Sequence, residues 1–261
     1  MSTNVLLERL KLPGEIVKLP SGGLFYKEGV LADDVVDGEV MVHPMSAYDD
    51  ICMKNISEII NGKSINTVFA RCIPQILKPT ELFGKDVDQL LLVLRKVTHG
   101  PTLEISYKHN CEDAENHRYT VQLSSMINSS KNLDPTIVDS QYTVPLDNGQ
   151  IVTLQPMRFS DVLAIMQDAN DFQTINSAEM QERMMRSTIK MIRAVDEITD
   201  FELIDEWVHQ LPNKEFKKIT AAMNGNNDWG PNTTTTIKCE DCGEDLVVDV
   251  PLNPLTFFLD S

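Results

Sequence analysis

Two cysteines near the end of the sequence have the spacing of metal ligands. Cys239 and Cys242 stand in IKCEDCGED, with two residues between them and a glycine directly after. Two thiolates at this spacing are half of a tetrahedral zinc site. A redox pair or a simple turn can show the same pattern, but residues 240–245 include four acidic side chains. Because negative charge raises thiol pKa values, it disfavours a redox role.

A third cysteine, Cys111, opens a similar acidic turn, CEDAEN, earlier in the sequence. Ala114 stands where a second cysteine would complete the pattern and has no donor atom, but His109 and His117 flank Cys111. Residues 109 and 111 are two apart on an expected strand and point to the same face, whereas residue 117 returns on the opposite strand. We therefore expect a structural zinc ion as the cofactor, bound by Cys111, Cys239, Cys242 and either His109 or His117.

Other groups that could do chemistry are sparse. The sequence has no GxSxG, HExxH or dinucleotide-binding glycine pattern. His43 precedes a proline, His99 ends an expected helix and His209 lies in an acidic helix, so capping or packing explains these histidines better than catalysis. We expect that the protein is not an enzyme.

Composition also limits the partners. The formal net charge is −16, from 23 basic and 39 acidic residues, and such a field repels a phosphate backbone. No apolar run approaches the roughly 20 residues of a membrane helix, and the start lacks the pattern of a secretory signal. Five scattered cysteines make a poor disulfide framework. We expect reduced thiols, a cytosolic location, and neither a nucleic-acid nor a membrane partner.

Hydrophobic periodicity predicts the elements that position the cysteines. Apolar residues recur at helical spacing over 49–61 and 86–98, over the Met-rich stretch 178–195, and over 201–211 and 214–223. Alternating residues on either side of CEDAEN and CEDCGED predict two β-hairpins. The segment LPSGGLFY, residues 19–26, predicts a sharp turn followed by an aromatic anchor.

The order of these elements repeats along the chain. Each half contains a short strand, a Pro-Met step at residues 44–45 or 156–157, helices, a glycine stop and a hairpin whose turn starts Cys-Glu-Asp. We interpret this as an internal duplication, with halves 1–132 and 133–261 and a polar linker at 124–140. Chance resemblance among short polar turns is the alternative. The expected fold class is α+β, with a zinc-ribbon-like knuckle joining the halves in a central sheet region and helices outside.

Two further stretches leave two interpretations open. The Met-rich residues 180–195 could pack against other subunits or in the core, since methionine adapts to uneven surfaces. The apolar residues 251–261 could dock on a neighbour or fold back on their own domain.

Several of these motifs together resemble a known family. LPSGGLFY, VHPMSAYDD, LRKVTHG and the late CEDCG before an apolar tail resemble the baseplate hub and hub-assembly-chaperone family of T-even-like contractile-tailed bacteriophages. That family tends to carry a cysteine pair in each hairpin, and Ala114 departs from this.

The resemblance implies a structural or assembly protein of the baseplate hub or central region, which acts by contacts with other tail proteins. It implies that the protein is located in the host cytoplasm during assembly and then in the tail baseplate of the virion. A transient assembly chaperone, absent from the mature virion, is the first alternative. A zinc-ribbon nucleic-acid-binding protein and a phage enzyme with an unrecognised site are the others.

Overall fold

The computed structural model describes residues 13–111, 115–136, 142–168, 177–226, 228–250, 252 and 257. They form helices and small antiparallel sheets, which confirms the α+β class. The buried apolar residues gather in two large cores and one small one. Ala114 lies outside the described residues.

The first core surrounds one long helix, α5 (Gly84–His99), in which all of residues 90–94 are buried. The expected helix over 86–98 is thereby confirmed. The single helix expected over 49–61 is wrong: two short helices replace it, because Asn55 caps the second with its side chain and so interrupts the first. The elements around α5 are β1 (Glu15–Lys18), β2 (Glu39–Val42), α2 (Ala47–Cys52), α3 (Ile56–Ile60), α4 (Lys63–Cys72), η1 (Pro79–Glu81) and α6 (Leu123–Asn128).

The second core lies under a three-stranded antiparallel sheet, ordered β5-β6-β7. The Met-rich stretch expected as one helix over 178–195 is instead a helix that ends at Met191 and continues directly as β7, because Ile192, Ala194 and Val195 are buried against β6. Met185 and Met191 pack in this core. The elements are β5 (Thr143–Pro145), β6 (Ile151–Leu154), α8 (Phe159–Asp168), α9 (Ser177–Met191), β7 (Ile192–Val195), α10 (Phe201–Gln210) and α11 (Asn213–Gly225).

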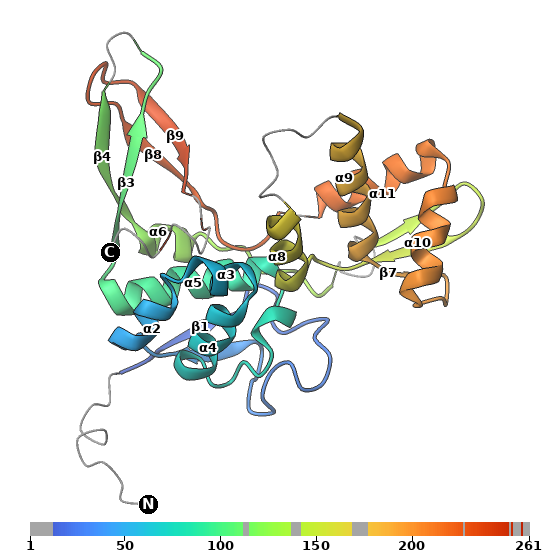
Figure 1. Ribbon diagram of the computed structural model, residues 1–261, viewed down its shortest axis with the longest axis horizontal. Helices are drawn as coiled ribbons and strands as arrows, with labels where there is room; N and C mark the ends of the chain where they lie inside the picture. Colours follow the sequence, from blue (N-terminus) through green and yellow to red (C-terminus); the bar gives the residue numbers. More distant parts are fainter. Residues whose placement is uncertain are drawn as a thin grey trace, which may run out of the picture.

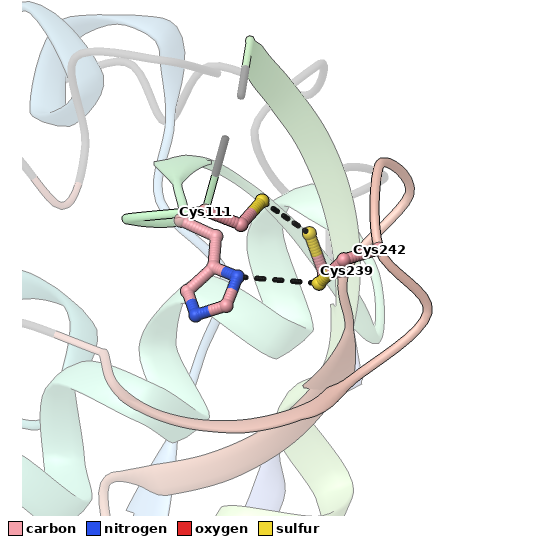
Figure 2. A group of neighbouring side chains, drawn as sticks. Cys111, Cys239 and Cys242 are labelled. Atoms are coloured by element: carbon pink, nitrogen blue, oxygen red, sulfur yellow. Dashed lines mark hydrogen bonds between the residues drawn. The ribbon is translucent and has the colours of Figure 1, made fainter. Parts of the chain in front are cut away.

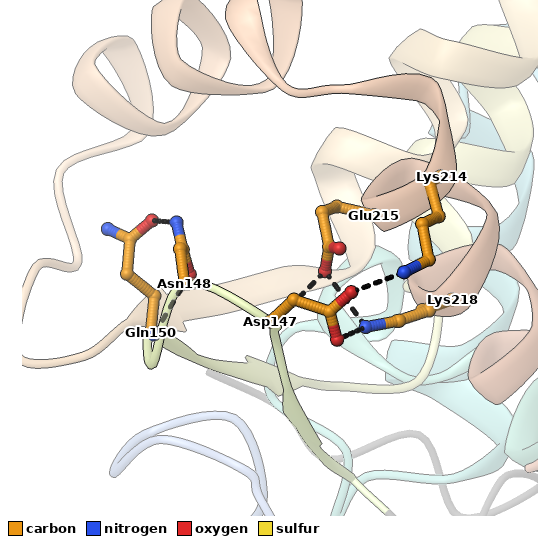
Figure 3. A network of polar contacts seen from close by, with 6 residues as sticks. All are labelled: Asp147, Asn148, Gln150, Lys214, Glu215 and Lys218. Atoms are coloured by element: carbon orange, nitrogen blue, oxygen red, sulfur yellow. Dashed lines mark hydrogen bonds and ion pairs between the residues drawn. The ribbon is translucent and has the colours of Figure 1, made fainter.

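Polar contacts fasten the β5–β6 turn to α11, as Figure 3 shows. Asp147 accepts hydrogen bonds from Lys214 and Lys218, and the buried Glu215 accepts one from the Asp147 backbone N–H. The two lysines lower the pKa of the Asp147 carboxyl. This end of the second core is therefore held by charge as well as by apolar packing.

The turn at residues 19–26 joins the two large cores. Tyr26 packs against both cores and donates a hydrogen bond of 2.5 Å to Asp86, while its oxygen accepts one from the Phe83 N–H. Asp86 is fully buried and also accepts from the Ser21 N–H. The rings of Tyr26 and Phe83 stack at 4.7 Å. The predicted turn with an aromatic anchor is confirmed.

The two predicted hairpins are present, and they lie side by side although one comes from the middle of the sequence and the other from near its C-terminal end (Figure 1). Tyr119, Ile237 and Val248 form a small apolar core between them. The prediction of a central sheet is wrong, since each hairpin is its own two-stranded sheet and the pair projects away from the helices. The strands are β3 (Thr102–Lys108), β4 (Asn116–Gln122), β8 (Thr234–Lys238) and β9 (Asp245–Asp249).

The end of the chain also returns to the first core. Val250 and Phe257 are buried there, and the Phe257 carbonyl accepts a hydrogen bond of 2.8 Å from Arg95. Phe257 thus folds back on its own chain. Residues 124–128 of the expected linker are helical, with Met126 buried, because α6 packs on α5.

The order of strand pair, helices and hairpin occurs twice in the described residues, and β7 has no counterpart in the first half. The duplication itself stays a prediction, as do the half boundaries.

Candidate metal centre

The tips of the two hairpins bring four potential metal ligands together. The ligand atoms of His109, Cys111, Cys239 and Cys242 all lie within 4.8 Å of one another. His109 and Cys111 follow β3, and the other two cysteines lie in the turn between β8 and β9. Figure 2 shows the three sulfur atoms converging from the two hairpins. The expected proximity of Cys111 to the cysteine pair of the other hairpin is therefore confirmed.

The closest ligand atoms have the separations of a tetrahedral site. Sγ of Cys111 lies 3.9 Å from Sγ of Cys239, and Sγ of Cys242 lies 3.4 Å from Nδ1 of His109. Zinc bonds of about 2.0 to 2.3 Å in tetrahedral geometry place neighbouring ligand atoms roughly 3.5 to 3.8 Å apart. A disulfide needs sulfur atoms about 2.05 Å apart. The geometry suits a metal ion and not an oxidised pair.

Backbone N–H groups in the β8–β9 turn favour the thiolate of Cys239. The N–H groups of Cys242 and Asp241 point at its sulfur and lower the pKa of this thiol to about 7, against the effect of burial. The expectation that nearby acidic residues raise the thiol pKa is thus wrong for Cys239, because these close backbone dipoles have the larger effect. For Cys111, burial and the neighbouring sulfurs raise the pKa to about 11.

The turn that carries the cysteine pair depends on a glycine. Gly243 has a φ of 76°, a conformation that side chains with a Cβ rarely adopt. Its N–H donates to the Cys239 carbonyl at 2.9 Å, and the Cys239 N–H donates to the Glu244 carbonyl at 2.9 Å. These bonds close the loop around the sulfur of Cys239, whose residue is only 2% exposed.

The structure distinguishes the two candidate histidines. His109 belongs to the ligand cluster, whereas His117 binds carboxylates: its Nε2 lies 2.8 Å from Asp241 and its Nδ1 lies 3.3 Å from Glu240. Asp241 raises the pKa of His117. His117 therefore joins the hairpins through ion pairs beside the cluster.

Further contacts surround the cluster. The second ring nitrogen of His109 lies 3.9 Å from a carboxylate oxygen of Glu244, which is too far for a hydrogen bond. The Glu115 N–H donates to Asp241, and the Glu240 N–H donates to the Tyr119 hydroxyl. The hairpin tips are therefore also joined by polar bonds beside the four ligands.

Four protein ligands would fill the coordination of a tetrahedral ion and leave no position for a substrate. This donor set is typical of structural zinc sites, in which the ion contributes to folding. Such a centre would join positions 128 residues apart in the sequence.

The fold and the site define an α+β protein whose two hairpins meet at a cluster able to hold a metal ion. Residues 43–259 match the family of T4 bacteriophage base plate proteins, and the chain belongs to that family. The matched region includes both hairpins and all four ligands. No curated protein and no solved structure matches the chain significantly. Among the described residues, no helix is long and apolar enough to cross a membrane.

Membership of this family indicates a structural role in the phage baseplate and contacts with other tail proteins. Sequence reasoning could not choose between the two histidines and did not find the buried pair of Tyr26 and Asp86. The tyrosine lies in the motif LPSGGLFY, but nothing near Asp86 in the sequence marks it as buried.

Proposed function

We propose that this protein is a structural or assembly component of a contractile tail baseplate, in its hub or central region, and that it acts by protein-protein contacts without catalysis. The family match over residues 43–259 carries the proposal. The close packing of two distant hairpins supports it, because a rigid projecting pair suits a protein that presents a surface.

We further propose that zinc occupies the centre formed by His109, Cys111, Cys239 and Cys242. Sulfur and imidazole ligands in tetrahedral arrangement favour zinc over magnesium or calcium, which prefer oxygen. The ion would fasten the C-terminal hairpin to the hairpin of the first half.

The experiment that tests the baseplate role is a pull-down of the tagged protein from infected cells. We expect other tail or baseplate proteins to be recovered. Recovery of DNA or of a small-molecule substrate instead would contradict the proposal. Mass spectrometry of purified virions then separates a resident component, which is present, from a transient hub assembly chaperone, which is absent.

A further inference from the structure

A basic pocket stands out on this strongly acidic protein. It has a volume of about 560 Å³ and is lined by Lys27, Arg158, Lys190 and Arg193, with Asp161 as the one acidic lining residue. The chain as a whole carries 39 acidic and 23 basic residues. The pocket is therefore positively charged, although the protein as a whole is negatively charged.

Two of the four cationic side chains can bind an anion without first breaking an ion pair. Lys27 and Arg193 are exposed and have no ion-pair partner among the described residues. Arg158 is paired with Glu81 through Nη1, but its Nε is buried and has no hydrogen-bond acceptor in the described part of the chain. A buried N–H without an acceptor is unfavourable, so an acceptor carried by a ligand would be stabilising there.

The pocket also has an apolar component. Phe25, Ile192 and Phe201 also line it, and Phe201 is 54% exposed. Interfaces between proteins are enriched in aromatic residues and arginine, and such residues often dominate the binding energy. Cations and apolar side chains in one pocket suit a segment that carries both carboxylates and apolar side chains. A compact polyanion such as inorganic phosphate would leave the apolar side chains without a partner.

We propose that this pocket binds a carboxylate-rich, partly apolar segment of a partner protein. The proposal rests on the function proposed above, in which the protein acts by contacts, and it names the chemistry of one contact. Nucleic acid is disfavoured as the occupant, because its long phosphate backbone would extend beyond the pocket over a protein of net charge −16, whereas a short acidic segment keeps its charges within the pocket.

The test uses the purified full chain and a short fluorescent peptide that alternates glutamate with phenylalanine and leucine. We expect saturable binding by fluorescence anisotropy, weaker at high ionic strength. A peptide with glutamine in place of glutamate should bind at least about tenfold more weakly, as expected when several charge-assisted contacts are lost. Equal binding of the two peptides would overturn the proposal.

Matched variants locate the binding. Arg193→Glu and Lys27→Glu should each weaken the peptide affinity about tenfold or more, as reversal of one close charge predicts. Lys217→Glu, which reverses an exposed charge on α11 outside the pocket, should leave the affinity unchanged. Phe201→Ala should weaken binding, whereas Leu203→Ala, an equally exposed change on the same helix, should not.

Circular dichroism of each variant confirms folding, and either Arg193→Glu or Lys27→Glu suffices if the other does not fold. Unchanged affinity in the folded pocket variants would contradict the assignment. Competition by tripolyphosphate at lower concentration than by the unlabelled peptide would also do so, since it would indicate a phosphate site. The assay contains one purified protein, so its failure leaves the pull-down and virion results unaffected.

Discussion

The environment of the candidate ligand Cys239 favours the deprotonated thiolate, which is the form that binds a metal ion. Its sulfur is buried, faces two backbone N–H groups and lies 3.9 Å from Cys111. Because metal ligands must be deprotonated, a thiol with a lowered pKa binds a metal ion with less competition from protons. His109 completes the set from the other hairpin, and the different position of His117 gives a direct way to test the assignment.

Substitution of the two histidines should separate their roles. We expect about one zinc ion per wild-type chain and well under half in His109→Ala and Cys242→Ser, because each removes one ligand of a four-coordinate site. His117→Ala should retain zinc, since its ring binds Asp241. Elemental analysis gives the metal content, and calorimetry should show a lower Tm for the first two variants, because ligand binding stabilises the folded state. Loss of zinc from His117→Ala with full content in His109→Ala would reverse the assignment.

Asp86 should make stability depend on pH. Burial raises the pKa of its carboxyl to about 6 in the folded protein, so the folded state holds the proton more tightly than the unfolded state does. The resulting stabilisation is full below about pH 4 and is lost as the pH rises through about 6. Between pH 5 and 7.5 the free energy of unfolding should therefore fall by about 1 to 3 kcal/mol more in the wild type than in Asp86→Asn.

Urea denaturation at several pH values measures this difference. Burial also raises the pKa of Asp88 to about 6, and Asp88→Asn provides the matched control, in which the contribution of Asp86 should persist. Parallel pH profiles for the wild type and Asp86→Asn would show that Asp86 contributes nothing.

At the scale of elements, local sequence was sufficient for the hairpins and for three of the helices. Alternating residues around two acidic turns predicted β3–β4 and β8–β9, and helical spacing predicted α5, α10 and α11. The strand β7 was missed because residues 192–195 follow a long helical pattern without a stop signal. The sequence left the choice between His109 and His117 open because it depends on register: His117 pairs with Tyr107 inside the hairpin, whereas His109 lies beyond the last pair, at Lys108.

Gly38 lies against the turn at residues 19–26 and should not tolerate replacement by a residue with a Cβ. Gly38 has a φ of 75°, and a Cβ there would lie 2.7 Å from the backbone carbon of Gly22. Since backbone cannot move aside cheaply, we expect Gly38→Ala to lower the free energy of unfolding by about 2 kcal/mol or more. Gly149→Ala is the control, because its φ is 86° but nothing lies within 4 Å of the added Cβ. Chemical denaturation should show a clearly smaller loss for Gly149→Ala, and equal losses would indicate that the close approach is unimportant.

At the scale of the whole molecule, the last hairpin packs against a hairpin from the middle of the chain. Neither the contact between the hairpins nor the burial of Phe257 against α5 could be inferred from periodicity, which reports only local structure. The shared cysteine chemistry was the one sequence signal for this long-range contact, because a metal site needs ligands from both turns.

Removal of the metal should release this hairpin while the second core stays folded. With a zinc chelator, hydrogen exchange should become faster in β8 and β9, since the ion that joins them to the end of β3 is removed. Exchange in β6 and α11 should be unchanged, because their contacts lie in the other core. Mass spectrometry of peptic fragments measures both regions, with Cys242→Ser without chelator as the genetic counterpart. Uniform exchange with and without chelator would show that the ion does not hold the hairpin.

The position of the cysteine pair also has a consequence during synthesis. Cys111 leaves the ribosome well before Cys239 and Cys242, roughly 6 to 26 seconds earlier at ordinary elongation rates. Until then, the face of the first hairpin that packs on β8 and β9 is exposed, and Cys111 has no other cysteine beside it. A nascent chain that stalls or is cut in this interval would therefore expose to host chaperones and proteases the apolar face of the first hairpin that β8 and β9 cover in the folded protein.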